Sequence, residues 1–544
     1  MSTFKGNIVD IPGRRIYYGS IRVENGIIVE ILPLEGTGTD FLMPGFVDSH
    51  VHVESSMLVP SEFARLAVVH GTVGTVSDPH EIANVLGMEG VEFMIQNGRE
   101  VPFKFYFGAP SCVPATTFET AGARLDVQEV EALLNRPEIT YLSEMMNYPG
   151  VLFGDPDVLA KIEAAKRVGK PIDGHAPGLM GEDAARYIAA GISTDHECFT
   201  REEAEHKLGL GMKILIREGS AAKNFEALID LLADHSDRMM FCSDDKHPDD
   251  LIKGHINQLA ARAIARRLDL YDVLKVACWN PVDHYSMAIG RLRVGDPADF
   301  IRVSDLDNFE VLETWIDGVL VASRGETHIP SVPVQVVNRF GIGPKAVSDF
   351  QLSADPTAQN ARIIRALNGE IVTESFFATP LVRDGLVQTD VSKDILKIAV
   401  INRYAEAPVA LALINGFGLD QGAIASCVAH DSHNIVAVGT DDASLCRAVN
   451  LIIENKGGIS AVSKVTSKVL PLPVAGIMAA DAGQDVARAY SEIDRFVRKT
   501  LGSPLAAPFM TLSFMALLVI PELKLSDLGL FDGKKFAFSP LFVK

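Results

Sequence analysis

Two histidines, His50 and His52, lie two positions apart in the stretch MPGFVDSHVHVESSM, residues 43–57. If the apolar run around them forms a strand, side chains at positions i and i+2 point to the same face of the sheet. The two imidazoles then lie side by side, and neutral imidazole is the commonest side-chain ligand of protein metals. The pair therefore indicates a metal site rather than a packed core.

Further histidines and acidic residues follow later apolar runs in the same way. They are Asp78, His80, Glu144, His175, His196, Asp244 and Asp245. A single buried histidine is more often a core residue than a ligand, and an aspartate after a strand can cap the next helix. Such explanations would have to recur independently at five or six equivalent positions. The shared position of these residues therefore favours one common site.

The residue types in this set indicate the class of metal. We predict six ligands, namely His50, His52, Glu144, His175, His196 and Asp244. Four imidazoles and two carboxylates, without cysteine, suit Mn, Fe, Zn or Co. Six ligands over-supply one catalytic ion that must keep an open position, so we expect two ions with Glu144 as their bridge. Bound metal lowers the pKa of water from about 15.7 towards about 7, which makes hydroxide available.

Eight short apolar runs position these residues, and longer helical stretches separate the runs. The runs are residues 45–50, 74–78, 103–111, 140–145, 170–175, 191–196, 212–220 and 238–245. Helical patterns lie between them, for example at 61–71 and 155–170. Repeated βα units over 44–285 match the size of an α/β fold of the (β/α)8 TIM-like barrel type, which carries its reactive groups at the carboxyl ends of the strands.

The segments that flank the predicted barrel have a different pattern. Residues 1–43 show alternating strands with a Glu-Asn-Gly turn, and residues 286–345 return to short β-rich stretches with a Gly-Asp-Pro turn. Because such strands need partners to bury a face, we expect the two segments to form one flanking β-sandwich. Residues 346–544 mix helical and strand patterns and are long enough for a separate C-terminal α/β domain.

Composition limits the partners and the location of the chain. A formal net charge of -20 disfavours nucleic acid and anionic membranes as the main partners. A small neutral or cationic ligand, or a metal, stays compatible with this charge. The N-terminal stretch lacks the pattern of a secretory signal, and the apolar run at 514–520 is far shorter than the ~20 residues of a membrane helix. Six scattered cysteines make structural disulfides unexpected, so we expect a cytoplasmic protein.

The sequence around the predicted ligands resembles the amidohydrolase superfamily and, within it, the adenine deaminases. The matching runs are DSHVH, SDPHEIANV, SEMMNYPGV, DGHAPG, STDHE, CSDDKHPDDL and, at 429–440, AHDSHNIVAVGT. Many superfamily members have a carboxylated lysine on the fourth strand, where this chain has Glu144; the ligand set otherwise shows no departure. The resemblance covers nearly the whole chain and implies a purine-metabolism hydrolase that converts adenine and water to hypoxanthine and ammonia. It implies a Mn2+ pair, with Fe2+ or Zn2+ as alternatives.

Three residues are expected to carry the catalytic roles in that reaction. Asp244 would bind one metal and accept the hydroxide proton, and Asp245 is the alternative, although the Ser-Asp pattern favours the first aspartate. Glu81 would protonate a ring nitrogen, or it is a first-turn glutamate stabilised by the helix dipole. For His80, the resemblance implies a role in orienting the substrate or stabilising developing charge.

The segment HDSHN at 430–434 allows three interpretations. Its residues His430, Asp431 and His433 could form a small metal site, a lid over the barrel mouth or a solvated turn, and the turn is the commonest of these. Other catalytic signatures fail. The P-C-x-x-C half of the cytidine deaminase signature is absent, and the glycines at 416–422 lack dinucleotide spacing and a Walker lysine.

Two other functions would use the same features. An amidase or deacetylase of the same superfamily would share the metal chemistry, and ligand spacing does not separate it from a deaminase. A non-catalytic barrel scaffold predicts missing ligands, whereas all six are present. The resemblance also implies a homodimer or higher homo-oligomer that acts on a small molecule, without nucleic acid or membrane partners.

Overall fold

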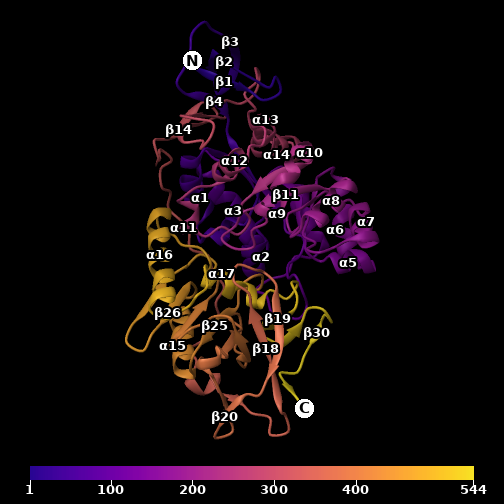
Figure 1. The fold of residues 1–544 in the computed structure, drawn as a ribbon, viewed down its shortest axis with the longest axis vertical. Helices are drawn as coiled ribbons and strands as arrows, with labels where there is room; N and C mark the ends of the chain where they lie inside the picture. Colours follow the sequence, from indigo (N-terminus) through magenta and orange to yellow (C-terminus); the bar gives the residue numbers. More distant parts are fainter.

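The computed structural model describes all 544 residues and shows an elongated molecule with three successive parts (Figure 1). A sheet that contains the N-terminus lies at one end, and a second large sheet lies at the other end near the C-terminus. The middle part contains most of the helices. No helix combines the length and the apolar character that crossing a membrane requires.

The N-terminal end is an eight-stranded sheet built from two distant segments of the chain, in the order β16-β15-β14-β13-β4-β1-β2-β3. Its strands are β1 Ser2–Asp10, β2 Arg15–Glu24, β3 Ile27–Pro33, β4 Phe41–Pro44, β13 Phe300–Val303, β14 Val311–Ile316, β15 Val319–Ser323 and β16 Glu326–Thr327. The antiparallel pair of β13 and β4 joins the two segments. Asn25 and Gly26, with φ of 50° and 79°, form the hairpin turn that the sequence predicts.

Eight parallel strands form the middle part. They are β5 Phe46–Val51, β6 Thr72–Ser77, β7 Lys104–Ala109, β8 Ile139–Met145, β9 Ile172–Gly174, β10 Thr194–Asp195, β11 Lys213–Arg217 and β12 Met239–Cys242. Hydrogen bonds join β5–β9 into one curled parallel sheet in chain order and β10–β12 into a second. The sheets meet where Val51 bridges to Asp244 and where Ser193 N–H donates to Ile172 O over 2.8 Å. Each predicted strand overlaps an observed one, so these eight predictions are confirmed.

Helices alternate with these strands, as βα units require. They are α1 Pro60–Ala67, α2 His80–Leu86, α3 Met88–Arg99, α4 Val127–Leu134, α5 Tyr148–Phe153, α6 Pro156–Arg167, α7 Gly181–Ala189, α8 Arg201–Gly209, α9 Phe225–Leu228, α10 Leu232–His235, α11 Pro248–Leu251, α12 Ile256–Ala265, α13 Leu270–Leu274 and α14 Asn280–His284. Every residue of β5 and β6 is buried, which is typical of parallel strands covered on both faces.

Residues 346–544, called the C-terminal region below, contain a nine-stranded sheet. Its strands are β18 Asn360–Ala366, β19 Thr373–Ala378, β22 Leu396–Ile401, β23 Ala410–Asn415, β24 Ala423–Ser426, β25 Ile435–Gly439, β26 Ile459–Val462, β27 Ser467–Leu470 and β31 Phe542–Val543. Its helices are α15 Asp442–Glu454, α16 Gly483–Lys499 and α17 Pro508–Ser513. Two small sheets add β17 Leu352–Ser353, β20 Leu381–Arg383 and β21 Leu386–Gln388, and β28 Leu523–Ser526, β29 Gly529–Asp532 and β30 Ala537–Phe538.

The C-terminal region packs directly on the middle part. One hydrophobic core of 133 buried residues extends through both, from Phe46 of β5 to Val436 of β25. Backbone hydrogen bonds cross the same boundary, because Ala479 N–H donates to Met57 O over 2.8 Å. At this boundary α16 packs against α1 and α11 of the middle part (Figure 1). The C-terminal region is therefore placed to contribute side chains to the strand ends of the middle part.

Candidate active site

All six predicted metal ligands lie at the carboxyl ends of the parallel strands and are buried. They belong to, or lie within two residues of the end of, β5, β8, β9, β10 and β12: His50, His52, Glu144, His175, His196 and Asp244. Their exposed fractions range from 0% for His50 to 6% for His175. Because the strands run parallel, their carboxyl ends meet at one rim. The structure thus brings together side chains that are up to 194 positions apart in the sequence, from His50 to Asp244.

His50, His52 and Asp244 form one side of this cluster. Nε2 of His52 lies 3.2 Å from Nε2 of His50 and 3.2 Å from Oδ1 of Asp244. Asp244 has φ of 53°, a left-handed conformation that aspartate tolerates better than most residues. Its N–H donates to the carbonyl oxygen of His50 over 2.9 Å. This turn holds the carboxylate that follows β12 against the histidines of β5.

Glu144 connects that side of the cluster to the other. Its Oε1 lies 3.3 Å from Nε2 of His52. Its Oε2 lies 2.8 Å from Nδ1 of His175 and 3.1 Å from Nε2 of His196. Each carboxylate oxygen therefore faces different imidazoles, an arrangement that fits the bridging role predicted for Glu144.

The donor atoms of the cluster fit a pair of divalent cations. Nitrogen and oxygen ligands about 2.0–2.2 Å from one ion lie about 3 Å from each other. The closest donor pairs around Glu144 are 2.8 Å and 3.1 Å apart, and those around His52 are 3.2 Å apart. Imidazole nitrogens and carboxylate oxygens, which are ligand types of divalent metals, converge here in a buried volume.

Asp48 and His255 fix the backbone next to the ligands. Oδ1 of Asp48 accepts a hydrogen bond from Ser243 N–H over 3.0 Å, and its Oδ2 lies 2.8 Å from Nε2 of His255. All three residues are buried. Asp48 belongs to β5 and Ser243 directly follows β12, so the contact ties the two strand ends together. Such supporting hydrogen bonds orient metal ligands and limit their rotation.

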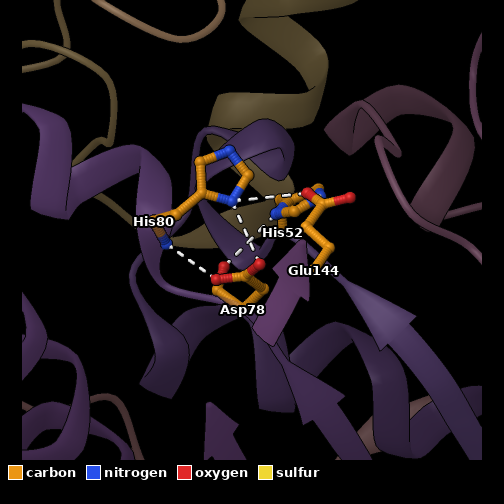
Figure 2. Close-up of side chains that lie close together, drawn as sticks. All are labelled: His52, Asp78, His80 and Glu144. Atoms are coloured by element: carbon orange, nitrogen blue, oxygen red, sulfur yellow. Dashed lines mark hydrogen bonds and ion pairs between the residues drawn. The ribbon is translucent and has the colours of Figure 1, made fainter. Parts of the chain in front are cut away.

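His80 lies beside Glu144 at the start of α2 (Figure 2). Its backbone N–H donates to Oδ1 of Asp78 over 3.1 Å. Its Nδ1 lies 3.1 Å from Oδ2 of Asp78 and 3.4 Å from Oε1 of Glu144. Burial lowers the pKa of His80, but Asp78 and Glu81 raise it more, so it stays well above its usual value. These contacts favour a positively charged ring at the edge of the cluster.

The segment 427–434, which connects β24 to β25, reaches the same rim from the C-terminal region. His430 and His433 are only 3% and 1% exposed, so the interpretation as a solvated turn is wrong. Nδ1 of His430 contacts one carboxylate oxygen of Glu81, and Nε2 of His433 contacts the other. The segment covers the strand ends, as the lid interpretation expects.

Family models match two parts of the sequence. The model described as the amidohydrolase family matches residues 41–321, and the model described as the adenine deaminase C-terminal domain matches residues 370–537. Proteins named adenine deaminase from Salinibacter ruber, Sulfurovum sp. and Methanosarcina mazei are 57%, 56% and 50% identical to the chain. The alignments cover 99%, 98% and 100% of the chain and 98%, 98% and 100% of those proteins. The chain belongs to the adenine deaminase family.

In this member of the adenine deaminase family, both parts of the chain line one small cavity. The strand ends contribute all the predicted ligands except His50, and the C-terminal region contributes His430 and Asp431. Oδ1 of Asp431 lies 3.5 Å from Nε2 of His80. The apolar lining consists of Met146, after β8, together with Ile371 and Leu517 of the C-terminal region. The cavity therefore combines many polar and charged side chains with three apolar ones.

Glu81 and His430 form a buried ion pair in this adenine deaminase family member. Burial alone would raise the pKa of Glu81, but His430, His433 and His80 hold it well below its usual range. Burial opposes a charge on His430 as well, yet Glu81 and Asp245 raise its pKa to about 9. At neutral pH the proton of the pair therefore resides mainly on His430, while Glu81 is ionised.

Sequence reasoning missed Arg217, the last residue of β11. Its guanidinium contacts Glu197 and lies 2.5 Å from Oδ2 of Asp244 and 3.4 Å from Oδ2 of Asp245. Arg217 lies at a strand end, where functional side chains of such a barrel are expected, but only metal-ligand residue types were considered at the strand ends. Asp245 in turn accepts a hydrogen bond from Ser55 Oγ over 2.6 Å. Asp245 also lines the cavity and, with His52 and Asp244, forms one of the groups that could hold a metal ion.

Proposed function

We infer that the chain hydrolyses adenine to hypoxanthine and ammonia. The observation that carries this proposal is the convergence of the six ligand-type side chains at one rim, where all of them except His50 line a cavity shared with the C-terminal region. Support comes from the nearly full-length identity to proteins named adenine deaminase. The amidohydrolase family model adds support for hydrolysis. No contact in the cavity favours an amidase or a deacetylase over this reaction.

The cluster would hold two divalent cations. His50, His52 and Asp244 would bind one ion, His175 and His196 the other, and Glu144 would bridge them. When bound, such cations make hydroxide available from water at neutral pH. Mn2+ is the metal that the resemblance implies, with Fe2+ or Zn2+ as alternatives.

Three side chains of the chain divide the remaining catalytic roles. Asp244 accepts the proton of the attacking hydroxide and passes it to the departing amine. Glu81, which lines the cavity, delivers a proton to a ring nitrogen of adenine. His80, next to Glu144 and charged in its surroundings, orients the base and stabilises the charge that develops on it.

The purine would be held between apolar side chains from both parts of the chain. Met146 faces the cavity from the strand ends, and Ile371 and Leu517 face it from the C-terminal region. Flat aromatic ligands gain affinity from such apolar contacts, whereas polar groups fix their orientation. The C-terminal region thereby contributes to substrate binding.

We also propose the complete architecture that the sequence predicts. The two parallel sheets form one (β/α)8 barrel over 44–285, segments 1–43 and 286–345 form a flanking β-sandwich, and 346–544 is a separate domain. Support comes from the contacts between the two parallel sheets and from the sheet shared by the flanking segments. Cytoplasmic location and self-association stay predictions from the sequence.

Metal analysis combined with an ammonia-release assay tests the function. The purified chain, loaded with Mn2+, is expected to contain two ions per chain and to release ammonia from adenine, with hypoxanthine as the second product. Adenosine, guanine and cytosine serve as comparison substrates, and N-acetylated amino sugars test the deacetylase alternative. Turnover of one of these compounds with adenine left untouched would refute the proposed specificity.

A further inference from the structure

The segment 427–434 of the C-terminal region is a rigid part of the cavity rather than a loose cover. All its residues are buried. His433 N–H donates to the carbonyl oxygen of Ala429 over 2.8 Å within the segment. Asn434 Nδ2 donates to the carbonyl oxygen of Thr120 over 2.9 Å, which ties the segment to the loop after β7. These bonds fix both histidines relative to the strand ends.

His433 holds Glu81 with one of its ring nitrogens. Nδ1 of His433 lies 3.3 Å from the backbone nitrogen of Ala429 and 3.1 Å from the carbonyl oxygen of Cys427. Burial lowers the pKa of His433, which favours the neutral ring. Nε2 contacts Oε2 of Glu81, and an ionised carboxylate oxygen can only accept, so the proton of this contact belongs to Nε2. His433 therefore donates a hydrogen bond to Glu81.

His430 contacts the other carboxylate oxygen of Glu81 and has a more acidic environment. Its Nδ1 contacts Oε1 of Glu81, and its Nε2 lies 3.7 Å from Oδ1 of Asp245. Its ring stacks on Phe514, with 5.6 Å between centroids and 28° between planes. The titratable groups that face it are Glu81, Asp245, Asp431, His433 and His247. Two carboxylates on opposite nitrogens favour the doubly protonated ring.

Imidazoles of the C-terminal region hold both carboxylate oxygens of Glu81. Each of its oxygens is in direct hydrogen-bond contact with one imidazole nitrogen. With both oxygens held, the three rotatable bonds of the Glu81 side chain are fixed. Without the C-terminal region, the same side chain would lack both partners.

We propose that His430 and His433 act through Glu81 in the proposed deamination: His433 fixes its position, and His430 supplies the proton that Glu81 delivers. The Nδ1 proton of His430 moves to Glu81, and Glu81 gives a proton to the ring nitrogen as hydroxide adds to C6. His430 is then neutral. The proton released when the next water molecule becomes hydroxide restores it, so each turnover conserves protons. This inference rests on the proposed role of Glu81.

Matched substitutions separate the two tasks. His433→Gln keeps a donor near the position of Nε2, whereas His433→Leu removes it. His430→Asn keeps a donor near the position of Nδ1 but carries no exchangeable charge, whereas His430→Phe removes the donor and keeps a ring against Phe514. Steady-state kinetics with adenine, metal content and thermal unfolding are measured for each full-length variant. His328→Asn, on the exposed flanking sheet, is the control.

We expect His433→Leu, His430→Phe and His430→Asn each to lower kcat about 100-fold, with KM changed less than about 3-fold. His433→Gln is expected to recover kcat to within about 5-fold of the unmodified chain. Glu81→Gln is expected to be at least as slow as the His430 variants, and all variants are expected to keep two ions per chain.

Three results would overturn the inference. His433→Gln as slow as His433→Leu would remove the positioning role, and His430→Asn at the unmodified rate would remove the proton-supply role. A third ion in the unmodified chain that is lost in the His430 variants would show that the histidines bind metal instead. If His433→Leu fails to fold, the rates of His433→Gln and His430→Asn relative to the unmodified chain still test the positioning and proton-supply roles. An unmodified chain that leaves adenine untouched would instead refute the proposed function itself.

Discussion

Nη1 of Arg217 lies 2.5 Å from Oδ2 of Asp244, and both side chains are only 2% exposed. The same guanidinium contacts Glu197 and Asp245, so one buried cation balances three buried carboxylates. Burial raises the pKa of Asp244, whereas Arg217 and His196 lower it more, and the pKa stays well below its usual range. Arg217 therefore favours the ionised form of Asp244, which metal binding requires.

Replacement of this arginine is expected to destabilise the chain and slow the reaction. Arg217→Met keeps most of the side-chain volume but leaves three buried carboxylates without their cation, at a cost of roughly 3–5 kcal/mol. Thermal unfolding should therefore begin at a lower temperature, and kcat for adenine should fall. Arg201→Met, at an exposed ion pair with Glu205, is the control and should change neither. Unchanged unfolding of Arg217→Met would contradict the charge-balancing role.

Removal of the Glu144 carboxylate tests its proposed role as the bridge between two metal ions. Glu144→Ala should bind fewer than two ions per chain and lose activity at least about 100-fold, because both ions would lose a shared ligand. The barrel should stay folded, as judged by circular dichroism. Glu163→Ala, on the exposed side of α6, should keep both metal and rate. Full metal content and rate in Glu144→Ala would exclude Glu144 from the metal site.

The apolar lining from the C-terminal region should affect substrate binding more than chemistry. Leu517→Ala removes part of the apolar surface proposed to contact the purine, and one such contact is worth about 1–3 kcal/mol. We expect KM for adenine to rise roughly 10-fold while metal content stays at two ions. Leu528→Ala, at a residue that is 55% exposed, is the control. An unchanged KM in Leu517→Ala would show that the purine lies elsewhere in the cavity.

Lys524 should make stability depend on pH. Its Nζ donates to the carbonyl oxygens of Ile371 and Phe514 over 2.8 Å and 2.9 Å, and burial lowers its pKa to about 7. Between pH 7 and the usual lysine pKa, the unfolded chain binds one proton more than the folded chain. The contribution of Lys524 to the free energy of unfolding should therefore rise with pH above 7, by about 1.4 kcal/mol per unit.

Thermal unfolding between pH 6 and pH 9 measures this dependence. The rise above pH 7 should be smaller in Lys524→Met than in the unmodified chain. Lys464→Met, at an exposed lysine, should keep the full rise. Identical pH dependence in Lys524→Met and the unmodified chain would show that Lys524 titrates normally.

The sequence by itself determined the eight parallel strands and the side chains at their ends. Alternating and continuous apolar runs are local signals, and parallel strands necessarily bring their carboxyl ends to one rim. His50, His52 and Glu144 could therefore be grouped before any coordinates were known. The hairpin turn at Asn25 and Gly26 was equally local, because its positive φ angles favour those residue types.

Only the tertiary structure decided which groups complete the cavity. His430 meets Glu81 across 349 positions of sequence, and the same packing brings Leu517 to the strand ends. The contacts of Asp244 and Asp245 depend on a left-handed turn and on the position of Arg217. No periodicity encodes such contacts, because they arise from how separately formed sheets pack. The sequence of segment 427–434 resembles a solvated turn, but the segment is buried in the folded chain and is part of the site.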